Sequence, residues 1–271
     1  MSEVTSVFSA RQSAASWQQF SASPPLVHCM TNLVVQAQTA NILLAAGASP
    51  AMVIDPEEVP VMARHAGALL INVGTITREL SEAMQLAVNA ASEAGVPWTL
   101  DPVAVGVLPL RSDFCRRLLD ASPAVIRGNA SEILALAGEG VGGRGVDSLE
   151  DSSRAVDAAI RLAADYRTLV VVSGKTDYVT DGHRIIRVQG GSPMMTAVTG
   201  TGCGLSALVA AYSALPGDRI HHVAAACQLM SLAGEQAARR SAGPGSFAVR
   251  LIDALWQLRH GTCQEVTDAA Y

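Results

Sequence analysis

The amino-acid sequence predicts a single α/β domain with a mainly parallel central sheet and helices on both of its faces. Short apolar runs alternate with segments of helical periodicity from about residue 50 onward, which is the pattern of βαβ units. The runs are continuously apolar, which is typical of strands buried on both sides. Of the 271 residues, 49% are hydrophobic and 16% are charged, which excludes a disordered chain, and no linker or internal repeat divides the sequence.

The elements follow in order along the chain. Five apolar runs bounded by glycine, proline or polar residues predict strands over 51–54, 67–74, 95–101, 124–126 and 168–172. Apolar residues at helical spacing, such as Leu80, Met84 and Ala87, predict helices between the strands, over 78–94, 111–120, 131–138 and 150–165. Asp181-Gly182 lies between two β-rich pieces and predicts a hairpin over 178–188. Beyond residue 200 the sequence predicts helices over 203–214, 220–240 and 246–259.

Charge and apolar length exclude two classes of partner. The net charge is −5, and the single lysine, Lys175, stands beside 18 arginines that form no basic stripe, so nucleic-acid binding is not expected. No apolar run reaches the roughly 20 residues that span a bilayer, and residues 1–25 lack the features of a signal peptide. The five cysteines have no CxxC spacing, which indicates free thiols in a reducing compartment. We therefore expect a cytoplasmic enzyme that binds neither nucleic acid nor a membrane.

The strongest motif is the glycine-rich segment 199–206 (TGTGCGLS), which leads into an alanine-rich helix. Its glycines let the backbone turn tightly, and the unpaired N–H groups at the positive end of the helix make an anion hole suited to a phosphoryl group. Cys203 lies in the first helical turn, where the pKa of a thiol is expected to fall below its usual value. The alternative is a structural turn in which Cys203 is a small buried side chain.

Polar residues follow three of the predicted strands, at the edge where sheets of this kind bind ligands. Asp101 and Glu132 supply two carboxylates that suit a Mg²⁺ ion. Alternatively, Asp101 caps a helix and Glu132 interacts with a helix dipole. Arg127 could bind a triphosphate with two N–H groups, or it is a solvated or ion-paired arginine.

Two motifs that resemble nucleotide-binding fingerprints are incomplete. Segment 173–176 (SGKT) resembles the end of a P-loop, but Leu169 stands where that motif needs a glycine. Gly200 and Gly202 lack the third glycine of a dinucleotide fingerprint, because Leu205 takes its place. We therefore expect neither a P-loop nor an NAD site.

Five segments occur in a specific order: CMTN (29–32), DPVAVG (101–106), RGNASE (127–132), VTGTGC (198–203) and GPGSF (243–247). In combination they closely resemble the hydroxyethylthiazole kinase family. The resemblance implies a ribokinase-like fold over residues 26–265 and transfer of the ATP γ-phosphate to the hydroxyl of 4-methyl-5-(2-hydroxyethyl)thiazole, in thiamine salvage and biosynthesis. It also implies Mg²⁺ as cofactor and a homotrimer with active sites between subunits. Residues 1–25 have no counterpart and are interpreted as an N-terminal extension that is free to be flexible.

The resemblance also implies a role for each matching residue. Asp101 and Glu132 would hold Mg²⁺ and the phosphates, and Cys203 would lie beside the reacting hydroxyl as a weak base or a positioning group. The implied ATP contacts are Arg127, Asn129, Ser173, Thr201 and Gly202, and the implied thiazole contacts are Asn32, Met52 and Gly200. Two other functions stay open: a kinase of the same fold for hydroxymethylpyrimidine or a pyridoxal-like alcohol, and a non-catalytic protein that binds thiazole or nucleotide.

Overall fold

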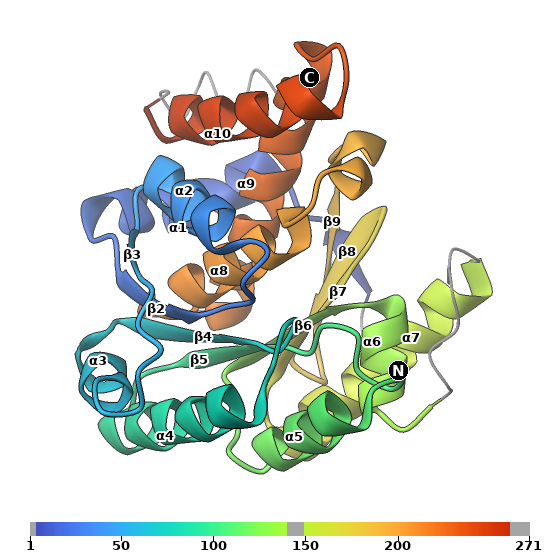
Figure 1. The fold of residues 1–271 in the computed structure, drawn as a ribbon. Helices are drawn as coiled ribbons and strands as arrows, with labels where there is room; N and C mark the ends of the chain where they lie inside the picture. Colours follow the sequence, from blue (N-terminus) through green and yellow to red (C-terminus); the bar gives the residue numbers. More distant parts are fainter. Residues whose placement is uncertain (1–3, 140–148, 261–271) are drawn as a thin grey trace.

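A nine-stranded sheet runs through the part of the chain that the computed structural model describes, residues 4–139 and 149–260 (Figure 1). Its strands are β1 (Val4–Val7), β2 (Leu26–Met30), β3 (Ser49–Ala51), β4 (Ala68–Asn72), β5 (Trp98–Asp101), β6 (Val125–Asn129), β7 (Leu169–Ser173), β8 (Thr176–Thr180) and β9 (Ile185–Gln189). They lie in the order β1-β9-β8-β7-β6-β5-β4-β2-β3, and of these nine β8 alone is antiparallel to its neighbours. The predicted α/β class and the hairpin, observed as β8 and β9, are confirmed.

Helices cover both faces of this sheet (Figure 1). One face carries α1 (Ala10–Ala22), α2 (Gln36–Ala46), α8 (Thr201–Ser213), α9 (Arg219–Arg239) and α10 (Pro244–His260). The other carries α3 (Val59–His65), α4 (Arg78–Ala94), α5 (Pro109–Leu119), α6 (Ala130–Leu136) and α7 (Leu149–Tyr166). Each face has its own cluster of buried apolar side chains, so both sides of the central strands are covered, as their continuously apolar sequences predict.

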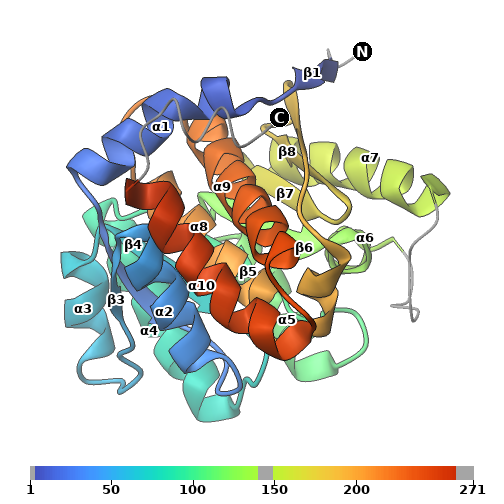
Figure 2. The same ribbon diagram turned by 90° about the horizontal axis from the view of Figure 1, so that it is seen from above.

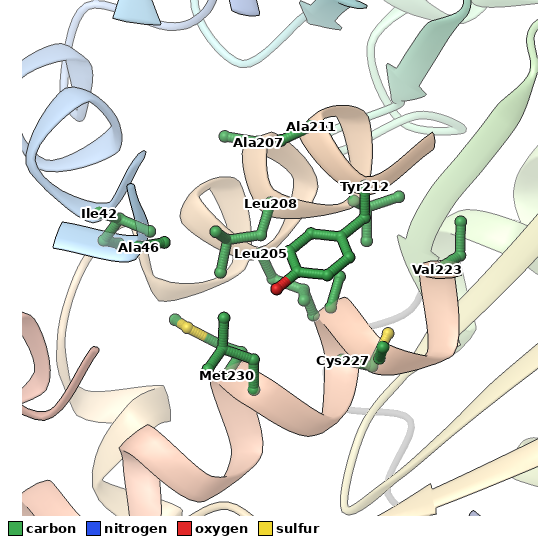
Figure 3. Close-up of a cluster of buried hydrophobic side chains, with 14 of the residues drawn as sticks. Ile42, Ala46, Leu205, Ala207, Leu208, Ala211, Tyr212, Val223, Cys227 and Met230 are labelled. Carbon is green, nitrogen blue, oxygen red and sulfur yellow. The ribbon is translucent and has the colours of Figure 1, made fainter. Parts of the chain in front are cut away.

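Helix α8 packs between the sheet, α2 and α9 (Figure 3). Its residues are buried except for Gly202 and Cys203, which are half-buried. Gly204 allows α2 to approach closely, because a methyl group there would overlap Cδ1 of Ile42. The interior of the fold therefore fixes α8 in place, while the first turn of the helix stays partly open to solvent.

The N-terminal residues differ from the sequence-based expectation of an extension over 1–25. The structure forms β1 and α1 there and joins both to the domain. Trp17 Nε1 donates a hydrogen bond to the Ala225 carbonyl of α9 (3.1 Å), and the Phe20 ring stacks on Tyr212 of α8 with 4.2 Å between centroids. The sequence of α1 is rich in serine and glutamine and gives no sign that its two aromatic side chains are packed against the domain. Their contacts are seen only in the tertiary structure.

Other elements agree with the predictions to different degrees. Helix α4 has the expected bounds, 78–94. The strand expected at 51–54 lies at 49–51, because β3 pairs with β2 over Leu26–His28 and ends where that pairing ends. No element was expected before residue 50, so β2 and α2, like β1 and α1, are found only in the structure.

Four cysteines lie in the described residues and all are free: Cys29, Cys115 and Cys227 are buried, and Cys203 is half-buried. The expectation of free thiols is therefore confirmed for these four. Cys263 and the expected domain end at residue 265 lie outside the described residues. None of the described helices is both long enough and apolar enough to cross a membrane.

Candidate active site

Polar side chains gather where the central strands end. Asp101 ends β5 directly opposite Asn72, which ends β4. Asn129 ends β6 directly opposite Ser173, which ends β7. Because these strands are parallel, their carboxyl ends meet at one edge of the sheet, which is the edge where open α/β sheets bind ligands.

A chain of hydrogen bonds links this edge to the start of α8. Asn72 Nδ2 donates to Asp101 Oδ2 (2.6 Å), and Asn72 Oδ1 accepts from Asn32 Nδ2 (3.0 Å). Asn32 Nδ2 also donates to Cys203 Sγ (3.3 Å). Two side-chain amides therefore connect the half-buried thiol to a fully buried carboxyl group.

Helix α8 begins at a bend that leaves backbone amides open. Gly200 precedes the helix with a φ of 89°, a left-handed conformation that glycine adopts without strain. No side chain caps this helix, and the first amide with a helical partner is that of Gly204, which donates to the Gly200 carbonyl (2.8 Å). The N–H groups of residues 201–203 thus have no hydrogen-bond partner within the described chain, and they lie at the positive end of the helix dipole. This is the geometry expected of an anion hole.

The Arg127 guanidinium lies beside this bend. A methyl group at Gly202 would lie 3.0 Å from Arg127 Nη1. Arg127 Nη2 donates to Ser173 Oγ, which in turn donates to the Gly128 carbonyl (3.3 Å). Arg127 Nε is buried and has no partner among the described residues, and the side chain belongs to a residue only 9% exposed. A nearly buried cation with unused donors next to open amides is suited to binding an anion.

Two buried carboxyl groups lie within the electrostatic reach of Arg127. Burial raises the pKa of Asp101 to about 7; Arg127 opposes this shift and the nearby Glu132 adds to it. Burial also raises the pKa of Asp177 to about 6, against the opposing effects of a hydrogen bond from the Gly174 amide and of Arg127. A cation bound near Asp101 would favour its ionised form.

The pKa of Cys203 does not fall as the sequence predicts. Burial raises the pKa of this thiol above its usual value, and the charge of Asp101 raises it further. The neighbouring asparagine amides and Arg127 lower it by less. The expectation of a lowered pKa was wrong, because burial and the charge of Asp101 outweigh the groups that lower the pKa. Cys203 is therefore a neutral thiol near pH 7.

Glu132 is held by backbone groups at the start of α6. Asn129 Oδ1 accepts from the Glu132 amide (2.9 Å), while Glu132 Oε2 accepts from the Asn129 amide (2.8 Å), which forms a capping box. Glu132 Oε1 accepts from the Ala104 amide (3.0 Å). The alternative role of Glu132 at a helix start is confirmed. Asp101, in contrast, caps no helix, since α5 begins only at Pro109.

The donors near Asp101 suit magnesium better than a softer metal. No group of three or more His, Cys, Asp or Glu side chains in the described residues could hold a metal ion. Asp101 Oδ1 is buried and forms no hydrogen bond of good geometry with those residues; the nearby Ser206 hydroxyl lowers the pKa of this carboxyl group, while the charge of Glu132 raises it. Two carboxylates with a free oxygen fit Mg²⁺, which prefers oxygen ligands and retains several waters or phosphate oxygens.

The remaining predicted residues lie near this cluster with different contacts. Thr201 Oγ1 donates to the Met195 carbonyl (2.8 Å) and so fixes the turn before α8. Met52 follows β3 at the sheet edge, one strand beyond β2, and packs on the apolar cluster of the α8 face. Segment 173–176 runs from the last residue of β7 to the first residue of β8, so a strand follows it instead of the helix that a P-loop requires, which confirms the exclusion of a P-loop.

Sequence reasoning missed two residues of this cluster, Asn72 and Asp177. Asn72 is a polar residue inside an otherwise apolar predicted strand, 67–74, and that contrast could have revealed it. Asp177 lies in β8 beside Tyr178 and Val179, where a buried acid is equally unusual. For Asn72 a polar side chain inside a predicted strand was the available signal, whereas Asp177 lay between the predicted strand 168–172 and the predicted hairpin 178–188 and had no such signal.

The sheet and the helices on both of its faces, with an uncapped helix start at the carboxyl edge, form a ribokinase-like fold. A ribokinase-like superfamily protein from Enterococcus faecalis V583 has the same fold at 15% identity, with a TM-score of 0.63 over 94% of this chain and 91% of that chain.

More specific likenesses identify the family. The model of the hydroxyethylthiazole kinase family matches residues 17–261. The chain is 60% identical to the hydroxyethylthiazole kinase of Pectobacterium carotovorum subsp. carotovorum (strain PC1) over 252 residues, which is 93% of this chain and 96% of that one. It also matches the structure of the hydroxyethylthiazole kinase protein from Pyrococcus horikoshii OT3, with a TM-score of 0.84 and 34% identity over 93% of this chain and 97% of that one. The chain belongs to the hydroxyethylthiazole kinase family.

Proposed function

We propose that this chain transfers the γ-phosphoryl group of ATP to the hydroxyl of 4-methyl-5-(2-hydroxyethyl)thiazole, a step of thiamine salvage and biosynthesis. Membership of the family supports this reaction. The structural observation that supports it most is the start of α8, where open amides and Arg127 lie beside the Cys203 thiol. Phosphoryl transfer needs fixed positive groups around the migrating phosphate and an acceptor alcohol placed in line with it.

On the phosphate side, the open amides of α8 and the Arg127 guanidinium bind the γ-phosphoryl group. The transition state is loose and carries its charge on the outer phosphate oxygens, so donors that are already in place stabilise it without rearrangement. Ser173 contributes by holding Arg127 through its hydroxyl. Thr201 and Gly202 contribute through their amides, since the Thr201 hydroxyl is already bonded to a backbone carbonyl.

On the acceptor side, Cys203 orients the thiazole hydroxyl. Its raised pKa keeps the thiol neutral, so it acts as a hydrogen-bonding group rather than as a thiolate base. A strong base is unnecessary, because in a loose transition state the alcohol becomes acidic only late. Asn32 holds the Cys203 sulfur in place through its hydrogen bond. Gly200 precedes the same helix turn, because its carbonyl accepts from the Gly204 amide. Asn32 and Gly200 therefore border the position of the thiazole hydroxyl beside Cys203.

Asp101 and Glu132 are the residues that would hold Mg²⁺, with Asn129 keeping Glu132 in its capping position. The ion, when bound, supplies positive charge that neutralises the phosphate oxygens. The partnerless buried oxygen of Asp101 supports this assignment, because a cation would offset the cost of burying its charge.

Exposed apolar side chains next to the site support a homotrimer with active sites between subunits. Leu33 and Val34, adjacent to Asn32, are 64% and 69% exposed. Trp256 on α10 is also exposed, and α10 lies alongside α2 (Figure 2). Apolar surface of this kind is commonly covered by another chain. Met52, one strand beyond β2, would contact the thiazole at this subunit boundary, and the enzyme would act in the cytoplasm, where ATP is available.

The function is tested by incubating the protein with ATP and Mg²⁺ and each of three alcohols: the thiazole, hydroxymethylpyrimidine and pyridoxal. We expect the thiazole to have the highest kcat/KM, with the phosphate ester identified by mass spectrometry. Absence of thiazole turnover would refute the proposal. Preferred turnover of either other alcohol would favour a related kinase, and calorimetric binding of thiazole without product would favour a non-catalytic binding protein.

A further inference from the structure

Gln38 of α2 lies directly against the bend that precedes α8. A methyl group at Gly200 would lie 2.9 Å from Gln38 Oε1 and 2.8 Å from Val35 Cγ1. The Gln38 side chain is half-buried, and no described residue forms a hydrogen bond with its amide. A glutamine amide offers two donors and a carbonyl acceptor. The Gln38 amide beside the candidate site is therefore available to form hydrogen bonds with a ligand.

Helix packing fixes the position of this side chain. Ile42 of α2 occupies the space over Gly204, a contact whose α2 side is visible in Figure 3. Gln38 precedes Ile42 by four residues, just as Gly200 precedes Gly204 by four. Because residues four apart share one face of a helix, Gln38 faces the start of α8 for the same reason that Ile42 faces its first turn. The packing of α2 against α8 therefore determines where the Gln38 side chain lies.

Gln38 lies near the residues that the proposed function places around the acceptor alcohol. Asn32 precedes α2 and donates to Cys203, and Gly200, which the Gln38 side chain borders, lies three residues before Cys203 at the same helix start. A heteroaromatic alcohol with its hydroxyl at Cys203 would extend its ring toward the α2 side of the bend. A nitrogen in that ring is a hydrogen-bond acceptor, which is the partner that the Gln38 amide lacks.

We propose that Gln38 is a specificity-determining residue: its amide donates a hydrogen bond to the ring nitrogen of the acceptor and so selects heteroaromatic alcohols that carry one. This inference rests on the proposed function. Sites built to hydrogen-bond a substrate group discriminate against analogues that lack it, because a protein donor is then left unpaired. A neutral hydrogen bond of this kind corresponds to a preference of roughly threefold to tenfold.

The test compares two acceptors in three proteins. The acceptors are the hydroxyethylthiazole and its thiophene analogue, in which a C–H group replaces the ring nitrogen. The proteins are the parent, Gln38→Met, which keeps the length of the side chain without its amide, and Gln36→Met as a matched control. Gln36 lies on the same helix, about 200° around its axis from Gln38. The readout is the ratio of kcat/KM for thiazole over thiophene, which does not depend on the fraction of folded enzyme.

We expect the parent and Gln36→Met to prefer the thiazole by roughly threefold to tenfold, and Gln38→Met to have a ratio near one. The KM for ATP should stay unchanged in all three proteins. The inference is overturned if Gln38→Met keeps the ratio of the parent, or if the parent has no preference. If the parent phosphorylates neither acceptor, the proposed function itself fails, and that result is distinct from an unchanged ratio.

Discussion

A Gly202→Ala substitution adds one methyl group to the first turn of α8. The methyl carbon would lie 3.0 Å from Arg127 Nη1 and 3.3 Å from Nη2, closer than the roughly 3.5–4.0 Å of an optimal contact between heavy atoms. The guanidinium would have to shift by a few tenths of an ångström, and the methyl group would occupy the side of the helix start that faces Arg127. We expect the γ-phosphate to lose its hydrogen bond from Arg127 as a result.

The size of the effect follows from the type of interaction. A hydrogen bond to a charged group contributes about 1.5–3 kcal/mol, and about 1.4 kcal/mol is a factor of ten in rate. The kcat/KM for ATP should therefore fall by about 10- to 100-fold. Stability should not fall, because Gly202 is helical and alanine favours a helix by up to about 1 kcal/mol over glycine.

Initial rates at varied ATP concentration and thermal unfolding would be measured for the parent, Gly202→Ala and Gly245→Ala. Gly245 is the matched control, because it also lies in the first turn of a helix, α10, and an added methyl group there meets no atom within 4 Å. We expect parental kinetics from the control. A Gly202→Ala protein with the parental kcat/KM for ATP would refute the placement of the phosphate beside Arg127.

Three further changes have defined outcomes. Cys203→Ala should lower kcat roughly tenfold, because one positioning hydrogen bond is lost, and should leave the melting temperature unchanged. Cys203→Asp should keep substantial activity. A parental kcat in Cys203→Ala would contradict the role of the thiol. Burial raises the folded-state pKa of Asp177 from 3.8 to about 6, so the folded protein binds this proton more tightly and becomes less stable as pH rises between those values. Asp177→Asn should remove up to about 3 kcal/mol of this pH-dependent loss of unfolding free energy. Urea unfolding of both proteins at pH 4.5 and 7.5 would detect the difference. An equal pH dependence of the unfolding free energy in both proteins would contradict the assignment to Asp177. Val34→Glu should convert a trimer to monomers in sedimentation velocity; a monomeric parent would contradict the trimer.

Local sequence patterns were sufficient for most strands and for the glycine-rich bend before α8. The glycine-rich bend at 199–206 is a local feature, since its conformation depends on glycine φ and on the helix that follows. The carboxyl-end rule likewise identified Asp101 and Arg127 before their contacts were known. These features could be predicted because they depend on neighbours in the sequence.

Features that depend on tertiary packing could not be predicted. Asn72 joins the site because β4 pairs with β5 in a register that places it opposite Asp101. The pKa of Cys203 rises because of burial, which the sequence around it does not reveal. Helix α1 is held by Trp17 and Phe20, whose partners lie about 200 residues further along the chain.

The position of the transferred phosphate is tested most directly by a crystal structure with a non-hydrolysable ATP analogue, Mg²⁺ and the thiazole. We predict γ-phosphate oxygens within hydrogen-bond distance of the amides of residues 201–203 and of Arg127, with the thiazole hydroxyl next to Cys203 Sγ. Phosphate density elsewhere, for example in the charged groove lined by Arg167 and Arg184 at the opposite end of β7, would contradict this placement.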